Sequence, residues 1–155
     1  PILQLNFKKM KTFPRVLLLA AATSIFLFGC SKDDSDSSPS ASNTQLLTAH
    51  IWVLTGATLN GSDYFSSLDP CEVDNILSFR TDNTYLMDEG AALCDTTAPQ
   101  TTTGPWAFAN NESTLVVDGG TADEQNLQLV MLSSTTLKLG FTDSLASVVY
   151  TYSKP

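Results

Sequence analysis

The chain has 155 residues, of which 43% are hydrophobic, 9% aromatic and 15% charged, and its net charge is −8. This length suits one domain with its own core, and the aromatic content is that of a folded protein, which argues against disorder throughout. The excess of acid argues against nucleic acid as a partner, because no basic stripe is available for phosphates.

The charge changes sign along the chain. Four of the eight lysines and arginines lie in the first fifteen residues, which hold no acid, whereas all sixteen acids lie from Asp33 onward. From Cys30 to the last residue the net charge is −12. A basic start followed by an acidic remainder is typical of a targeting segment joined to a mature protein.

Residues 10–29 are predicted to be a signal peptide. Met10 is suited to start translation, which leaves residues 1–9 as an upstream extension or a cloning scar. A short basic region, residues 10–15, precedes a thirteen-residue apolar stretch at 16–28. A membrane-spanning helix needs about 20 such residues, whereas the apolar region of a signal peptide needs about 7–15, so the length favours a signal peptide.

Residues 27–30, Leu-Phe-Gly-Cys, resemble the bacterial lipobox. The resemblance implies that Cys30 carries acyl chains, becomes the new N-terminus and anchors the protein in a membrane, since several chains on one residue hold stably. The alternative is an ordinary signal peptide with a chance cysteine. Residues 31–43 contain no large apolar side chain and are predicted to be a flexible tether.

The first residues of this tether resemble the export signal of Bacteroidetes lipoproteins. The resemblance implies that the protein is carried to the outer face of the outer membrane, and the alternative is a merely solvated linker. The residues concerned are Ser31, Lys32, Asp33 and Asp34.

Residues 44–155 are predicted to form one all-β domain. After a helical turn at 44–49, eight short runs follow, most of them alternating apolar and polar residues, and no long helical period interrupts them. The side chains expected to share the inner face are, run by run, Trp52, Leu54 and Gly56; Leu77 and Phe79; Tyr85 and Met87; Trp106 and Phe108; Leu115 and Val117; Leu127, Leu129 and Met131; Leu137, Leu139 and Phe141; and Val148, Tyr150 and Tyr152.

Short and long connections alternate strictly between these runs. Three have hairpin length, at 81–83, 110–113 and 133–135, and four are longer, at 60–74, 89–103, 118–124 and 142–146. An up-and-down meander has this pattern when all long loops lie at one end. Eight strands are enough to close such a meander, so an eight-stranded antiparallel up-and-down barrel is predicted.

Cys71 and Cys94 lie in the two longest loops. These loops share an end of the meander, and an exported location is oxidising, so we expect the two cysteines to form a disulfide. The alternative is a pair of free thiols.

The ordered motifs around these cysteines resemble the lipocalin-like domain of Bacteroidetes lipoproteins, over residues 46–153. The matching segments are Asp-Pro-Cys-Glu-Val-Asp-Asn-Ile-Leu-Ser-Phe at 69–79, Asp-Asn-Thr-Tyr at 82–85, Glu-Gly at 89–90, Cys-Asp at 94–95 and Gly-Pro-Trp-Ala-Phe at 104–108. The resemblance implies a small lipocalin-like barrel that binds a ligand. True lipocalins carry Gly-x-Trp on the first strand, whereas here it lies at 104–106.

Eleven of the thirteen acids of the domain fall in or beside the long loops, and its three lysines and arginines, Arg80, Lys138 and Lys154, fall near the short-loop end. An acidic rim disfavours anions and attracts cations or basic partners. A Ca²⁺ site is one interpretation of part of this rim, and solvated acids that keep the protein soluble are the alternative. The candidate ligands are Asp69, Glu72, Asp74 and Asp95.

No catalytic residues are predicted. The chain has one histidine, His50, and no Gly-x-Ser-x-Gly, His-Glu-x-x-His or phosphate-binding glycine loop. Two functions stand: a surface-anchored module that binds a small molecule or glycan at the long-loop end, or a filled barrel that displays its loops to a protein partner. The candidate contacts are Tyr64 and Phe65 in the first long loop, with Trp52, Tyr85, Trp106 and Tyr150 as a cavity lining or, alternatively, as core.

Overall fold

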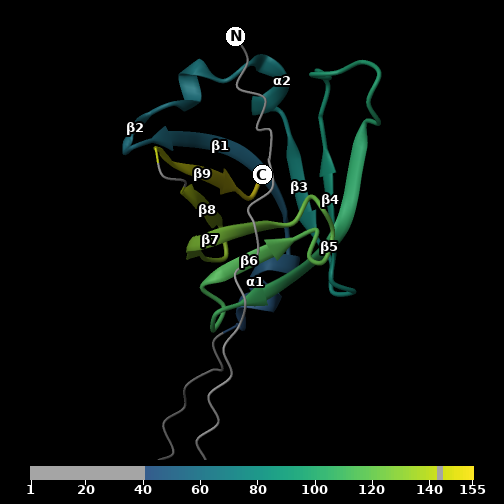
Figure 1. Ribbon diagram of the computed structural model, residues 1–155, viewed down its shortest axis with the longest axis vertical. Coiled ribbons are helices and arrows are strands. Elements are labelled where there is room, and N and C mark those ends of the chain that lie inside the picture. Colours follow the sequence, from purple (N-terminus) through teal and green to yellow (C-terminus); the bar gives the residue numbers. More distant parts are fainter. Residues whose placement is uncertain (1–40, 143–144) are drawn as a thin grey trace, which may run out of the picture. The chain divides into compact units, whose positions relative to one another are not determined.

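The computed structural model describes residues 41–142 and 145–155, which form an antiparallel barrel (Figure 1). The predicted signal peptide, Cys30, the export signal at 31–34 and Asp143 lie outside the described residues. In chain order the elements of the described part are α1 Asn43–Thr48, β1 Ile51–Leu59, β2 Ser62–Asp63, the 3₁₀ helix η1 Phe65–Ser67, α2 Pro70–Val73, β3 Ile76–Phe79, β4 Thr84–Asp88, β5 Thr101–Ala109, β6 Thr114–Val117, β7 Gln125–Leu132, β8 Thr136–Thr142 and β9 Ser147–Ser153.

The barrel is closed because β1 pairs with β3 on one side and with β9 on the other. Each strand from β3 to β9 pairs with the next, and all pairings are antiparallel. The two-residue strand β2 pairs only with the end of β1, through a turn in which Asn60 and Gly61 both have positive φ. The eight-stranded up-and-down barrel predicted from the sequence is confirmed, with β2 as an addition.

The helix α1 closes the short-loop end of the barrel. It begins at a capping box in which Ser42 Oγ accepts from the Gln45 amide and Gln45 Oε1 accepts from the Ser42 amide. The helix contacts β3 and β7, and Leu47 is fully buried in the core. The predicted helical turn is therefore present, and it is the plug of this end.

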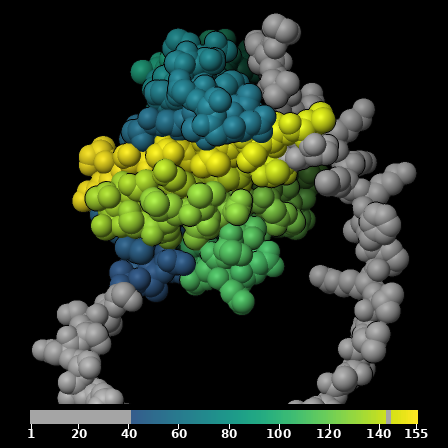
Figure 2. Space-filling view, turned by 90° about the vertical axis from the view of Figure 1, so that its left-hand side faces the viewer, coloured from purple at the N-terminus to yellow at the C-terminus, as the bar shows by residue number. Residues whose placement is uncertain are grey.

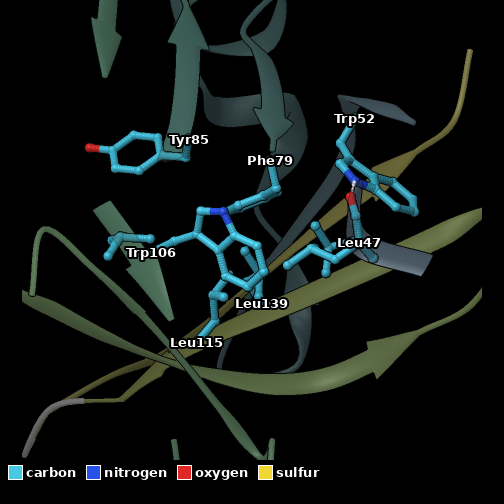
Figure 3. Packing of buried hydrophobic residues seen from close by; sticks show 9 residues of the cluster. Leu47, Trp52, Phe79, Tyr85, Trp106, Leu115 and Leu139 are labelled. Atoms are coloured by element: carbon cyan, nitrogen blue, oxygen red, sulfur yellow. Dashed lines mark hydrogen bonds between the residues drawn. The ribbon is translucent and has the colours of Figure 1, made fainter. Parts of the chain in front are cut away.

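The core fills the middle of the barrel and its short-loop half. Its buried members are Leu47, Trp52, Phe79, Tyr85, Trp106, Leu115, Val117, Leu137 and Leu139. The indole of Trp106 lies at its centre (Figure 3). Its ring is edge-on to that of Phe79 at 5.7 Å and to that of Phe108 at 5.5 Å between ring centroids. Edge-to-face contacts of this kind favour tight aromatic packing beyond the area they bury.

Two β-bulges change which side chains face the inside of the barrel, so the predicted inner faces are wrong at these two places. The pairing of β1 with β9 shifts between Leu54 and Gly56, so Ala57 is buried opposite Tyr150 while Gly56 pairs with Thr151 on the outer face. The pairing of β7 with β8 shifts between Leu129 and Met131. As a result Leu132 pairs with the buried Leu137, and Met131, predicted to face inward, lies outside beside Lys138.

Candidate functional site

The described parts of the long connections leave the barrel at the end opposite α1, and we call this end the mouth. The longest connection, residues 60–75, carries β2, η1 and α2, and the next, residues 89–100, joins β4 to β5. A disulfide between Cys71 and Cys94 ties these two segments together, with 5.1 Å between the Cα atoms. The predicted disulfide is thus confirmed, and with it the prediction that the two loops share one end.

The inner face of the barrel is apolar as far as the mouth. Phe108, Leu129, Leu132 and Tyr152 pack around the core and are partly buried, and so are the inward-facing side chains nearest the mouth. The partly buried residues nearest the mouth, which we call the mouth lining, are Leu77, Met87, Leu127, Phe141, Val148 and Tyr150. Their inward direction follows from their pairing and alternation with core residues, as in Leu139 opposite Tyr150 and Phe141 opposite Val148. The mouth therefore presents apolar surface above a filled core.

The first long connection lies against β9 at the edge of the mouth. Figure 2 shows the blue-green atoms of this connection next to the yellow atoms of β9. Burial raises the pKa of the Tyr150 hydroxyl, and the nearby Glu72 carboxylate and Tyr64 hydroxyl add to the shift. Tyr64 and Phe65 are themselves partly buried. Three of the predicted contacts, Tyr64, Phe65 and Tyr150, thus belong to the mouth.

The other three predicted contacts belong to the core. Trp52 is fully buried and donates its indole N–H to the carbonyl of Leu47, and Trp106 donates its indole N–H to the carbonyl of Arg80. Tyr85 is also buried, although Figure 3 shows its hydroxyl pointing away from Phe79 and out of the aromatic cluster. The structure therefore favours the core-filling interpretation for these residues, and we remove Trp52 and Trp106 from the ligand candidates.

The hydroxyl of Tyr85 reaches a carboxylate that the sequence did not single out. It donates to Asp118 Oδ2 at 2.8 Å. Burial, this hydrogen bond and the charges of Asp118 and Asp123 raise the pKa of Tyr85. Gly104 lies beside Tyr85 on the neighbouring strand β5. A Cβ atom at Gly104 would overlap Asp118 Oδ1 and approach the Tyr85 ring to 2.9 Å. The glycine of the Gly-x-Trp motif is therefore required because a carboxylate fills the place of its side chain.

Asp74 fastens the two disulfide-linked segments a second time. Its Oδ2 atom accepts from the backbone amides of Ala91 and Ala92 at 2.7 and 2.9 Å. Gly90 lies so close that a Cβ there would come within 2.7 Å of the same oxygen. The other side-chain oxygen of Asp74 and that of Asn75 are buried without a hydrogen-bond partner in the structure.

The four predicted calcium ligands are not assembled as a metal site. Glu72 Oε2 accepts from the Asp69 amide at the start of α2, and Asp95 Oδ1 accepts from the amide and hydroxyl of Thr97. Asp74 is engaged with Ala91 and Ala92. Within residues 41–142 and 145–155, no three Asp, Glu, His or Cys side chains are grouped so that they could hold a metal ion. The carboxylates instead organise the loops that carry them.

The predicted separation of charge between the two ends is visible in the described residues. Arg80 lies in the β3–β4 turn. Lys154 donates its backbone amide to the carbonyl of Thr135 in the β7–β8 turn, and Lys138 lies on β8 near that turn. The described acids in or beside the long loops are Asp63, Asp69, Glu72, Asp74, Asp88, Glu89, Asp95, Asp118, Asp123 and Glu124. His50, beside the plug, lies edge-on to Trp52.

These features define an antiparallel up-and-down barrel with a filled, helix-plugged end and a loop-rich, partly apolar mouth. A family model described as a lipocalin-like domain matches residues 49–139, which is more than half of the chain. The chain therefore belongs to the lipocalin-like domain family, whose fold is typically one that binds small molecules. A comparison with curated proteins finds no match. Among the described residues, no helix is long and apolar enough to span a bilayer.

Proposed function

We propose that this protein is a lipid-anchored binding protein whose barrel takes up a small molecule, or the apolar face of a glycan, at the mouth. The observation that carries the proposal is the set of partly buried apolar side chains on the inner face at the mouth, the mouth lining. Leu77, Met87 and Leu127 pack against the core on one side and remain partly accessible on the other. Ligand sites in small barrels of this kind combine apolar walls with a few polar groups.

A titration with N-phenyl-1-naphthylamine, a neutral apolar dye that fluoresces on leaving water, tests this proposal. We expect Tyr150→Ala to weaken dye binding, because Tyr150 is the largest side chain of the mouth lining. Met131→Ala is the matched control, since Met131 is apolar and 47% exposed on the outer face. Equal effects of the two substitutions, or no binding to the unaltered protein, would contradict the proposal. The same two variants, applied to a glycan array, test the glycan form.

The second candidate is a filled barrel that displays its loops to a protein partner. It is favoured by the burial of Trp52, Tyr85 and Trp106, whose side chains pack together with the core in the middle of the barrel. In this case the exposed acids of the mouth would attract a basic surface. A partner that binds the dye-saturated protein as well as the free protein would support this second function.

The membrane anchor and the location rest on the sequence alone. We infer that Cys30 is acylated and that residues 31–34 direct the protein to the cell surface. Growth with an alkyne-labelled palmitate should label the unaltered protein and not Cys30→Ala. Protease added to intact cells should degrade the protein, whereas replacing Lys32, Asp33 and Asp34 by alanine should protect it while leaving the lipid label in place.

A further inference from the structure

One carboxylate lies on the inner face of the mouth rather than on its rim. Gly104 pairs with the buried Tyr85 and alternates with the buried Trp106, so a side chain at position 104 would point into the barrel. Asp118 Oδ1 occupies the place of that missing side chain. The carboxylate of Asp118 therefore lies over the inner face of β5 at Gly104, beside the Tyr85 hydroxyl.

This carboxylate is sparsely hydrogen-bonded for a partly buried group. Its Oδ2 atom accepts only the Tyr85 hydroxyl, a neutral donor, and within the described residues Oδ1 accepts no hydrogen bond and no basic side chain forms an ion pair with Asp118. Oδ1 is not among the buried side-chain atoms that lack a partner, so solvent reaches it. This oxygen is thus available to accept a hydrogen bond from a ligand.

Backbone contacts hold the residue that carries this carboxylate. Asp118 has a φ of 55°, in the left-handed region where aspartate and asparagine are more frequent than other non-glycine residues. Its amide donates to the carbonyl of Pro105, and its own carbonyl accepts from the amide and hydroxyl of Thr121. These backbone contacts shape the loop without using the carboxylate.

We propose that Asp118 is the polar anchor of the ligand site and that it selects ligands with a cationic or hydrogen-bond-donating head, such as a primary ammonium group, on an apolar body. This inference rests on the function proposed above and names the ligand class of the same site. The Oδ1 atom accepts a hydrogen bond from the head group of the ligand, and the hydrogen bond from Tyr85 fixes the orientation of the carboxylate. The mouth lining contacts the apolar body of the ligand. The ten described mouth acids and the absence of a basic side chain among the described residues there disfavour a carboxylate or phosphate head.

The competing explanation is that Asp118 and Tyr85 form a latch that only holds the β6–β7 loop. Asp118→Asn separates the two, because the amide oxygen of asparagine still accepts the Tyr85 hydroxyl while the negative charge is lost. Asp123→Asn is the matched control, since it removes the same charge from the same loop at an exposed position. Thermal melting of both variants reports whether the latch survives.

The probes are three ten-carbon compounds, decylammonium, decanol and decanoate, titrated calorimetrically at pH 7 below their micelle concentrations. The unaltered protein should bind decylammonium most tightly and decanoate least. Asp118→Asn should weaken decylammonium binding about tenfold or more, the scale of a hydrogen bond between charged groups, and should leave decanol binding within about twofold. Asp123→Asn should leave the preference for decylammonium in place.

A variant-independent measurement completes the test. Intermolecular nuclear Overhauser effects should connect the methylene group next to the nitrogen of decylammonium with the Tyr85 ring. Equal decylammonium affinity in Asp118→Asn and the unaltered protein, or contact of Tyr85 with the methyl end instead, would overturn the role of Asp118 and leave the binding function intact. Failure of all three compounds and of the neutral dye to bind would overturn the binding function itself.

Discussion

The indole N–H of Trp52 donates to the backbone carbonyl of Leu47 at 2.9 Å, and both side chains are fully buried. Through this bond the first strand of the barrel holds the helix that plugs it (Figure 3). Because α1 has only six residues, its own hydrogen bonds cannot keep it folded, and its stability comes from this docking.

We therefore expect Trp52→Phe to destabilise the protein by about 2–4 kcal/mol, because it leaves the Leu47 carbonyl buried without a donor and creates a cavity. Urea unfolding followed by near-ultraviolet circular dichroism measures the change. Ile51→Ala is the control, since Ile51 is 46% exposed on the adjacent position and its loss should change the free energy of unfolding by less than about 1 kcal/mol.

Gly104→Ala should destabilise the protein by about 1–3 kcal/mol, because the added methyl group would overlap the Asp118 carboxylate and crowd the Tyr85 ring. Gly56→Ala is the matched control. A Cβ there would meet only Thr151 at an ordinary 3.6 Å, so this variant should be neutral or slightly stabilising. Similar melting temperatures for the two variants would contradict the assigned role of Gly104.

Replacing both Cys71 and Cys94 by serine should lower the free energy of unfolding by about 3 kcal/mol, the value that the chain-entropy model gives for a loop of this length. Thermal melts with and without a thiol reductant provide the measurement. The reductant should lower the melting temperature of the unaltered protein and leave that of the double variant unchanged. A reductant effect of the same size in both would show that the disulfide is not its target.

Asp74→Ala should release residues 91 and 92 from the first long connection, because it removes the acceptor of both backbone amides. The expected result is faster hydrogen exchange at the Ala91 and Ala92 amides, with the β-strand amides unchanged. Asp95→Ala serves as the comparison, since its carboxylate accepts only from Thr97 in the same turn. Unchanged exchange at Ala91 in Asp74→Ala would show that the disulfide alone holds the two segments.

The protein should lose stability at alkaline pH. Burial raises the pKa of the Tyr152 hydroxyl, with the nearby Tyr150 adding to the shift, and burial together with Asp118 raises that of Tyr85. A raised folded-state pKa gives a contribution that is fully present below the unfolded value of about 10 and is lost as the pH rises further. Melting temperatures between pH 8 and 11 should therefore be level at first and then fall, and Tyr152→Phe should fall less steeply.

The strand count, the alternation of loop lengths and the disulfide could be predicted because each leaves a mark in the sequence. Inward residues recur at every second position, and turn residues separate the runs. The two bulges could not be predicted, because nothing in the sequence distinguishes the extra residue of a bulge from the other residues of the strand. For this reason Gly56 and Met131 were placed on the wrong face, and Ala57 and Leu132 were missed.

The candidate site was predictable only in outline. Tyr64, Phe65 and Tyr150 could be assigned to the mouth from their place in the chain, but the sequence could not tell whether Trp52 and Trp106 line a cavity or fill the core. Asp118 was counted among the rim acids because it directly follows a strand. Its inward position depends on a positive φ and on the missing side chain of Gly104, fourteen residues earlier, and only the three-dimensional structure brings these together.

The pairing of Val53 in β1 with Ser153 in β9 has a consequence for how the protein is made. The first strand of the domain pairs with its last strand, so the ring cannot close until the whole domain is available. Until then β1 and β8 are open sheet edges that can pair with other molecules, and contacts so distant in sequence form slowly. The seven residues of β9 thus remove two open sheet edges as well as completing the wall of the barrel.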